Sequence, residues 1–121
     1  MKGRILVIED SEDNIALIKY ILRAFGHEPL LAHSGPEAIA IACREQPDLI
    51  LLDIRMPNMD GYEVAAALRR KPGLQHIRIV AVTASAMVGD RERIAAAGFD
   101  GYIPKPIEPE TFIPEVERFL R

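Results

Sequence analysis

The sequence has little or none of several features that define large classes of proteins. Cys43 is its only cysteine, which excludes an internal disulfide and suits a reducing cytosol. No apolar run approaches the roughly 20 residues of a membrane-spanning helix, and the short run after Arg4 is too brief for a signal peptide. A net charge of −3 lacks the basic excess typical of nucleic-acid binding. The chain is therefore expected to be soluble and cytoplasmic, bound to neither nucleic acid nor a membrane.

Internal repeats, low-complexity tracts and linkers are also missing, so residues 1–121 are expected to form one domain. A chain of this length buries roughly two thirds of the surface that its unfolded form exposes, so it needs no disulfide or structural metal to fold. Cys43 lies inside an apolar helical pattern and is expected to be a small core residue. His27, His33 and His76 stand in predicted loops without ligand spacing, which favours surface positions.

Five short segments have the composition of β-strands. Three continuous apolar runs, at residues 5–8, 49–52 and 79–82, are typical of strands buried on both faces. Two weaker segments, residues 28–32 and 101–103, contain or adjoin proline, which cannot donate to a strand ladder. The three runs are therefore expected inside a sheet and the two weaker segments at its edges.

Helical patterns alternate with these strands. Apolar residues share one face of the first predicted helix and of the last, namely Ile15, Ile18, Leu22 and Phe25, and then Phe112, Val116, Phe119 and Leu120. Ser34 and Asp60 indicate helix starts, and Gly26 and Gly98 indicate helix ends. The alternation predicts an α/β fold, a doubly wound, flavodoxin-like sheet of five parallel strands in the order 2-1-3-4-5 with helices on both faces.

Pro114 interrupts the apolar pattern of the last predicted helix. Proline has no N–H to bond back one turn, to Glu110. We therefore expect either a short irregular turn over residues 109–112 before the main helix, or a bend near Ile113.

Three acidic residues stand at the ends of predicted interior strands. Glu9 and Asp10 follow residues 5–8, and Asp53 follows residues 49–52. The predicted strand order reverses between these two strands, where open α/β sheets place their sites. Carboxylates about 4 Å apart repel by roughly 4 kcal/mol at an effective dielectric near 20, so the cluster requires a cation, for which Mg²⁺ is the usual choice beside phosphate. Capping of the following helices is the alternative for each element alone.

Two further polar residues are expected at the same edge. Thr83 follows residues 79–82, and Lys105 follows residues 101–103. A nucleophilic carboxylate, a metal-binding pair, a hydroxyl donor and a cation are the groups that accept a phosphoryl group and neutralise its charge. The pattern therefore favours phosphoryl transfer.

At these positions the sequence resembles the receiver domains of two-component response regulators, over essentially the whole chain. The motifs that carry the resemblance are Glu9-Asp10, Asp53, Met56-Pro57, Met59-Asp60-Gly61, Thr83-Ala84 and Lys105-Pro106. Each motif is weak alone, but their order on successive strand ends is specific. Within the family, the resemblance is to single-domain regulators of the chemotaxis or cell-cycle type.

The resemblance implies a role for each matching residue. Asp53 would accept a phosphoryl group from a phosphohistidine on a kinase or phosphotransfer protein. Asp10, Asp53 and the carbonyl of Arg55 would bind Mg²⁺, with Glu9 acting through water. Thr83 and the N–H of Ala84 would hold phosphoryl oxygens, and Lys105, before a cis bond to Pro106, would contact one.

Further roles concern switching and output. Tyr102 matches the switch aromatic of the family, although an edge-strand tyrosine with its hydroxyl in water is the alternative. Arg55 and Ser85 would modulate the lifetime of the phosphoryl group, and a solvated loop charge is the alternative for Arg55. The resemblance implies output through the helix before residues 101–103, that strand and the last helix, in a monomer or a phosphorylation-dependent dimer.

Rival functions lack the residues that they need. A haloacid-dehalogenase-type aspartyl-phosphate phosphatase carries a second aspartate two residues after its nucleophile, where this chain has Arg55. A flavodoxin-like electron carrier would need hydroxyl and glycine residues where Glu9 and Asp10 stand. We therefore expect a signalling phosphoacceptor rather than an enzyme, and a stand-alone protein. A domain of a hybrid kinase or of a longer regulator is the alternative.

Overall fold

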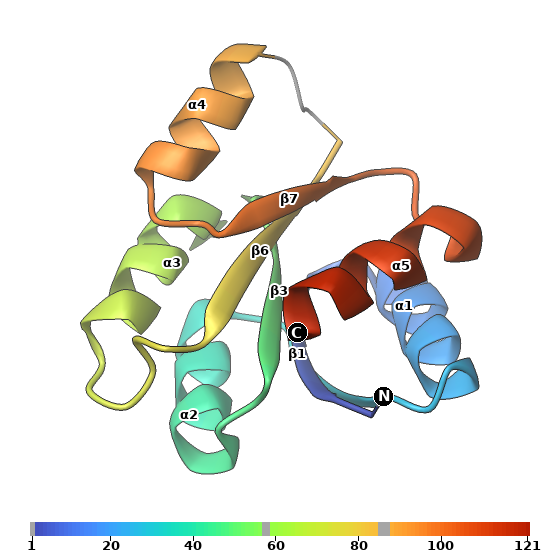
Figure 1. The fold of residues 1–121 in the computed structure, drawn as a ribbon. Helices are drawn as coiled ribbons and strands as arrows, with labels where there is room; N and C mark the ends of the chain where they lie inside the picture. The colour runs from blue at the N-terminus through green and yellow to red at the C-terminus, as the bar shows by residue number, and fades with distance from the viewer. Residues whose placement is uncertain (1, 57–58, 85–87) are drawn as a thin grey trace.

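The fold is an α/β sandwich in which a central parallel sheet separates two layers of helices (Figure 1). The computed structural model of the chain describes residues 2–56, 59–84 and 88–121. Its elements are β1 (Arg4–Ile8), α1 (Glu12–Ala24), β2 (Glu28–Ala32), α2 (Gly35–Glu45), β3 (Leu49–Asp53), β4 (Arg55–Met56), β5 (Met59–Asp60), α3 (Gly61–Arg70), β6 (Arg78–Thr83), α4 (Val88–Ala96), β7 (Gly101–Pro104) and α5 (Pro109–Leu120).

The main sheet has the strand order β2-β1-β3-β6-β7, and all its pairs are parallel. This is the predicted order 2-1-3-4-5, so the predicted fold class is confirmed. The proline-containing strands β2 and β7 lie at the two edges, as expected for a residue that cannot donate to a ladder.

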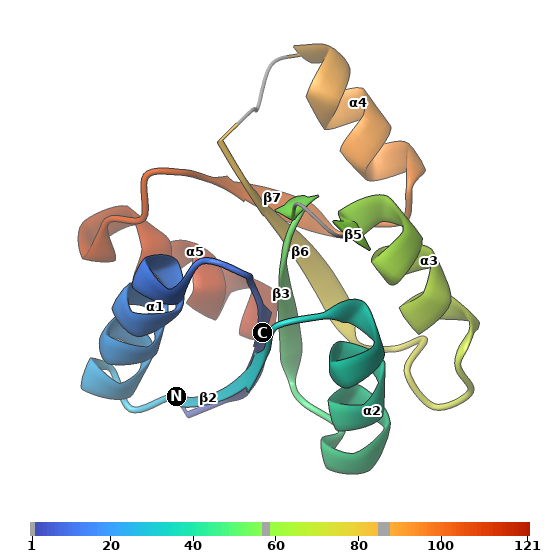
Figure 2. The ribbon, with the colours of Figure 1, turned by 180° about the vertical axis from the view of Figure 1, so that it is seen from behind.

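The hydrophobic core has two halves, one on each face of the sheet. On β1, Leu6 and Ile8 face the half that α2, α3 and α4 complete, whereas Ile5 and Val7 face α1 and α5. Figures 1 and 2 show the two helical layers on opposite sides of the strands. Strands β1, β3 and β6 are covered on both faces, which is why their sequences are continuous apolar runs.

The parallel register brings the residues that follow β1, β3, β6 and β7 to one edge of the sheet. Ile8 pairs with Leu52, and Asp53 pairs with Val82. Thr83 in turn pairs with Pro104. The residues just after these paired positions therefore converge on the carboxyl edge, where open α/β sheets bind ligands.

Helix ends follow the sequence signals. The Ser34 hydroxyl accepts the Glu37 N–H, and a carboxylate oxygen of Asp60 accepts the Tyr62 N–H, so both residues are N-caps. Gly26 and Gly98 lie just beyond α1 and α4 with φ of 85° and 94°, a left-handed conformation that favours glycine. The predicted starts and ends are confirmed at these positions.

Two apolar positions were predicted wrongly. Phe25 is half exposed, because it is the C-cap of α1, where the backbone leaves the helical path that carries the buried face. Cys43 is exposed rather than a small core residue. The core of α2 is formed instead by Ala38 and Ala42, which lie on another side of that helix.

His27 is a buried residue, not the surface residue that was predicted. Its Nδ1 accepts the backbone N–H of Gly3, and its Nε2 lies 3.0 Å from a carboxylate oxygen of Glu117 on α5. These partners satisfy both ring nitrogens, which makes the burial possible. His33 and His76 are exposed, as predicted.

Proline at position 114 does not break α5 into two pieces. The helix is continuous from Pro109 to Leu120, so the predicted irregular turn over residues 109–112 is wrong. The other expectation, a bend near Ile113, stays a prediction. Pro114 faces solvent, while Phe112, Val116 and Phe119 are buried, as predicted.

The segment after β3 contains a feature that the sequence did not indicate. Strands β4 and β5 pair antiparallel, with Arg55 opposite Asp60. The backbone of Gly61 lies so close to Ile54 that a Cβ on Gly61 would be only 2.7 Å from the Ile54 Cα. This close approach holds the start of α3 against the end of β3.

Within the described ranges, none of the helices has the length and apolar character needed to cross a membrane.

Candidate functional site

Three carboxylates gather at the carboxyl edge, where β1 and β3 end. Glu9, Asp10 and Asp53 each offer an oxygen within 4.8 Å of the others. Glu9 and Asp53 are buried, with 1% and 4% of their surface exposed, and Asp10 is the more exposed member. Burial weakens the screening of their repulsion by water, so the cluster needs positive charge nearby.

Lys105 supplies one positive charge to this cluster. Its ammonium lies 3.2 Å from Glu9 Oε1 and 3.3 Å from Asp53 Oδ2. Burial disfavours the charged form, but the charges of Asp53 and Glu9 outweigh burial and raise the pKa of Lys105 above its ordinary value. The ammonium is therefore protonated at neutral pH. The peptide bond between Lys105 and Pro106 is cis, as the resemblance implied.

Glu9 is held in place by bonds to both of its oxygens. Oε2 accepts the backbone N–H groups of Asp10 and Ser11, and Oε1 accepts from Lys105. These donors occupy much of the capacity of the carboxylate to accept hydrogen bonds or bind metal directly.

Asp53 also has each oxygen in a defined environment. Oδ1 accepts the backbone N–H of Arg55 at 3.0 Å, and Oδ2 faces Lys105. The hydrogen bond from the Arg55 N–H holds the backbone after β3 close to the Asp53 carboxylate. The Arg55 side chain is exposed. Neighbouring donors therefore fix the orientation of this carboxylate.

The donor set fits a divalent cation. Three carboxylates and one ammonium carry a formal net charge of −2, which one Mg²⁺ balances. All the donors are hard oxygen atoms, the ligands that Mg²⁺ prefers. Asp10 is the most accessible of the three, and among the described residues its carboxylate has no hydrogen-bond or ion-pair partner. The cluster therefore has the charge and chemistry of a magnesium site.

Thr83 and Ala84 follow the core of β6 at the same edge. Thr83 is buried, with 2% of its surface exposed, and it lines a hollow together with Arg55 and Asp60. Ala84 is exposed, next in the chain. Ser85, predicted to modulate the site, lies outside the described residues.

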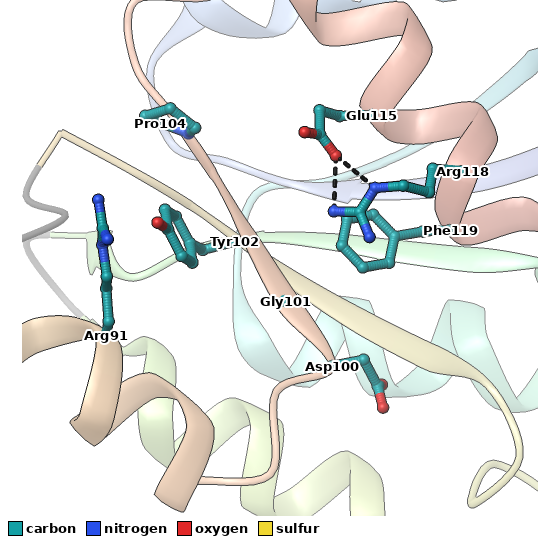
Figure 3. A pocket seen from close by; sticks show the side chains of 8 residues that line it. All are labelled: Arg91, Asp100, Gly101, Tyr102, Pro104, Glu115, Arg118 and Phe119. Carbon is teal, nitrogen blue, oxygen red and sulfur yellow. Dashed lines mark hydrogen bonds and ion pairs between the residues drawn. The ribbon is translucent and has the colours of Figure 1, made fainter.

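Tyr102 lies on β7, away from the acid cluster. Its ring is partly buried, and the guanidinium of Arg91 on α4 lies 5.3 Å from the ring centroid. Figure 3 shows this pair on one side of β7 and Glu115, Arg118 and Phe119 of α5 on the other. These residues line a hollow over α4, β7 and α5, which is the surface predicted for output.

A second stacked arginine beside the site escaped prediction. The guanidinium of Arg93 on α4 lies 4.3 Å from the ring centroid of Tyr62 on α3. The Tyr62 ring in turn meets Phe99 edge-on, with centroids 5.9 Å apart. Arg93 and Tyr62 line the hollow that contains Thr83. No local sequence signal links two residues on different helices, so only the packed helices reveal the contact.

Together, the fold and the edge cluster define a doubly wound α/β protein with an acidic, magnesium-compatible site at its topological switch point. A family model described as response regulator receiver domain matches residues 5–117. The chain belongs to this family, and it is a receiver domain of two-component signal transduction.

Similar proteins span the whole length of the chain. The polar-differentiation response regulator DivK of Brucella ovis is 41% identical over 120 residues, which are 99% of this chain and 98% of the relative. The chemotaxis protein CheY4 of Vibrio cholerae superposes with a TM-score of 0.92 at 28% identity, over 98% of this chain and 99% of that chain. These likenesses favour the receiver interpretation over the phosphatase and electron-carrier alternatives.

One similar structure contains a metal. The receiver domain of a sensor histidine kinase from Pseudomonas aeruginosa PAO1 superposes with a TM-score of 0.89 at 32% identity, over 99% of this chain and 98% of that chain. That structure has a magnesium ion coordinated in its active-site cleft. The chain described here has an acidic group of three at the carboxyl edge of its sheet.

Proposed function

We propose that Asp53 is the phosphoacceptor of this receiver domain. The observation that carries the proposal is the placement of a buried Asp53 within 4.8 Å of Asp10 and Glu9, with the Lys105 ammonium 3.3 Å from Oδ2. Asp10, the other aspartate of the cluster, is more exposed and has no ion pair with Lys105. The donor would be a phosphohistidine on a sensor kinase or on a histidine phosphotransfer protein in the cytoplasm.

The transfer forms one bond and breaks another. An oxygen of Asp53 attacks the phosphorus, a P–O bond forms, and the P–N bond to the donor histidine breaks, with its electron pair returning to the imidazole. Lys105 would pair with one phosphoryl oxygen, while the Thr83 hydroxyl and the N–H of Ala84 would hold the others. The chain thus acts as a signalling phosphoacceptor that assists its own phosphorylation and dephosphorylation.

Magnesium would be held by Asp10, Asp53 and the backbone carbonyl of Arg55, with Glu9 acting through water. When bound, Mg²⁺ supplies positive charge that stabilises the charge of the transferring group. The fixed oxygens of Glu9 and the accessible carboxylate of Asp10 support this division of roles. Arg55 and Ser85 would set how readily water reaches the phosphoryl group, and therefore its lifetime.

The signal would leave through the surface of α4, β7 and α5. A phosphoryl group adds close to two negative charges at the strand edge, and Thr83 would turn toward it. Tyr102 would follow by moving inward from its place beside Arg91. This would change the hollow shown in Figure 3 and so create or remove a site for a protein partner or a second phosphorylated copy.

The test is intact mass after incubation with acetyl phosphate, with Mg²⁺ or with EDTA. The parent should gain one phosphoryl group when Mg²⁺ is present, and Asp53→Asn should gain none. Asp48→Asn is the matched control, because Asp48 precedes β3 at its opposite end, where its side chain accepts the Arg4 N–H. A full-yield adduct on Asp53→Asn would exclude Asp53 as the phosphoacceptor.

A further inference from the structure

The outer face of α1 exposes large side chains that the phosphoryl site does not use. Tyr20 is 75% exposed and Leu17 is 40% exposed, and both lie on this helix. A shallow hollow beside Tyr20 is lined by Ala16, Lys19, Arg23 and Ala24. Single exposed apolar residues are ordinary, but an aromatic ring next to a hollow and small residues is suited to packing against another surface.

Helical geometry places four exposed side chains of α1 in one outward stripe. At 100° per residue, Asp13, Ala16, Tyr20 and Arg23 lie within one side of α1, and all four are exposed. The buried residues Ile18, Ile21 and Leu22 of the helix pack against the sheet. The stripe is therefore an outer surface of the molecule, not a part of its core.

The stripe has a symmetric order along the helix. Asp13 and Arg23 stand five residues before and after position 18, with opposite charges, and Ala16 and Tyr20 stand two residues before and after it, as small and large residues. Two antiparallel copies of α1 that cross at this position would place each Tyr20 over Ala16 of the second copy. Each Asp13 would meet Arg23 of the second copy. A two-fold interface requires this kind of self-complementarity.

We propose that α1 forms an antiparallel interface with a second copy of this chain, without phosphorylation. Charge complementarity favours a second copy as the partner, because the stripe itself carries both the acid, Asp13, and the base, Arg23, of the ion pairs. Neither Asp13 nor Arg23 has a side-chain hydrogen-bond or ion-pair partner among the described residues. The contact is one helix face, so the dimer is weak, and its ion pairs make it weaker at high salt.

The test is sedimentation of the full chain at high protein concentration and low salt, in EDTA and without phosphodonor. Asp13→Arg and Arg23→Asp should each weaken self-association at least fivefold, because like charges then face each other. An equimolar mixture of the two variants should associate about as well as the parent, since the basic pair of one variant then faces the acidic pair of the other. A variant with both substitutions should also retain dimerisation, because the charges are exchanged and still complementary.

Glu92→Arg is the control, with a charge reversal on the exposed side of α4, and it should leave association unchanged. Circular dichroism of each variant checks that α1 still folds. A parent that stays monomeric, single variants that associate like the parent, or a mixture that does not associate would each overturn the proposal. Because no step requires phosphorylation, its failure is distinguishable from failure of the phosphoacceptor assignment.

Discussion

Among the single residues of the site, the three carboxylates carry more negative charge than the Lys105 ammonium can neutralise. Lys105 contacts Glu9 and Asp53 directly, while Asp10 adds a third negative charge without an ion-pair partner among the described residues. Like charges at such distances cost free energy that folding has to supply. The repulsion lowers the stability of the metal-free protein, and a bound cation would relieve it.

This repulsion predicts the effect of Asp10→Asn on the free energy of unfolding. In EDTA the variant should be more stable than the parent, by about 1 kcal/mol in the free energy of unfolding, because one repelling charge is gone. In excess Mg²⁺ the order should reverse, since the parent gains more from binding. Urea unfolding in both buffers measures this. Glu12→Gln, on the exposed first turn of α1, should show no reversal. Lower stability of Asp10→Asn in EDTA would contradict the repulsion.

Among the secondary-structure elements, α5 keeps its helix although Pro114 lies inside it. The burial of Phe112, Ile113, Val116 and Phe119 offsets the missing backbone bond. Tertiary packing thus overrides a local preference that would otherwise end the helix.

Pro114→Ala should therefore stabilise the protein, by about 1–2 kcal/mol, because alanine restores an N–H that can bond to the carbonyl of Glu110 and removes the ring clash. The gain is reduced by the greater freedom of the unfolded chain. Pro109→Ala is the control, since Pro109 stands at the first helical position, where no bond is missing. Urea unfolding of both variants gives the comparison, and equal effects would show that the interior position is not special.

Across the molecule as a whole, the acidic site and the proposed output surface are separate places joined by β6 and β7. Thr83 pairs with Pro104 in the sheet, and Tyr102 precedes Pro104 by two residues on β7. Arg91 stacks on Tyr102 from α4. A movement of Thr83 toward a phosphoryl group therefore has a short physical path to this ring.

Thr83→Ala should uncouple phosphorylation from that surface. The variant should still accept a phosphoryl group, but the change in the ring NMR signals of Tyr102 should fall severalfold relative to the parent. Thr111→Ala serves as the control, because Thr111 lies on α5, where its hydroxyl donates to the carbonyl of Glu108. An undiminished response of Tyr102 and undiminished partner binding in Thr83→Ala would show that the coupling does not pass through Thr83.

Local patterns in the amino-acid sequence were enough to predict the main strands, their order and the residues at the carboxyl edge. Apolar runs, glycines and prolines are local signals of backbone structure, and parallel strands connected by helices leave few allowed orders. Once the order is known, Glu9, Asp53, Thr83 and Lys105 follow as neighbours, because each stands just beyond or at the end of its strand.

The burial and contacts of individual side chains, by contrast, came from the folded molecule. His27 was predicted on the surface of a loop, yet its ring lies between Gly3 and Glu117, which the chain brings together from both of its ends. Cys43 was predicted in the core, yet it is exposed on α2. The stacking of Arg91 on Tyr102 likewise joins α4 to β7. Such contacts depend on how helices are rotated against the sheet, and packing across the whole molecule sets that rotation.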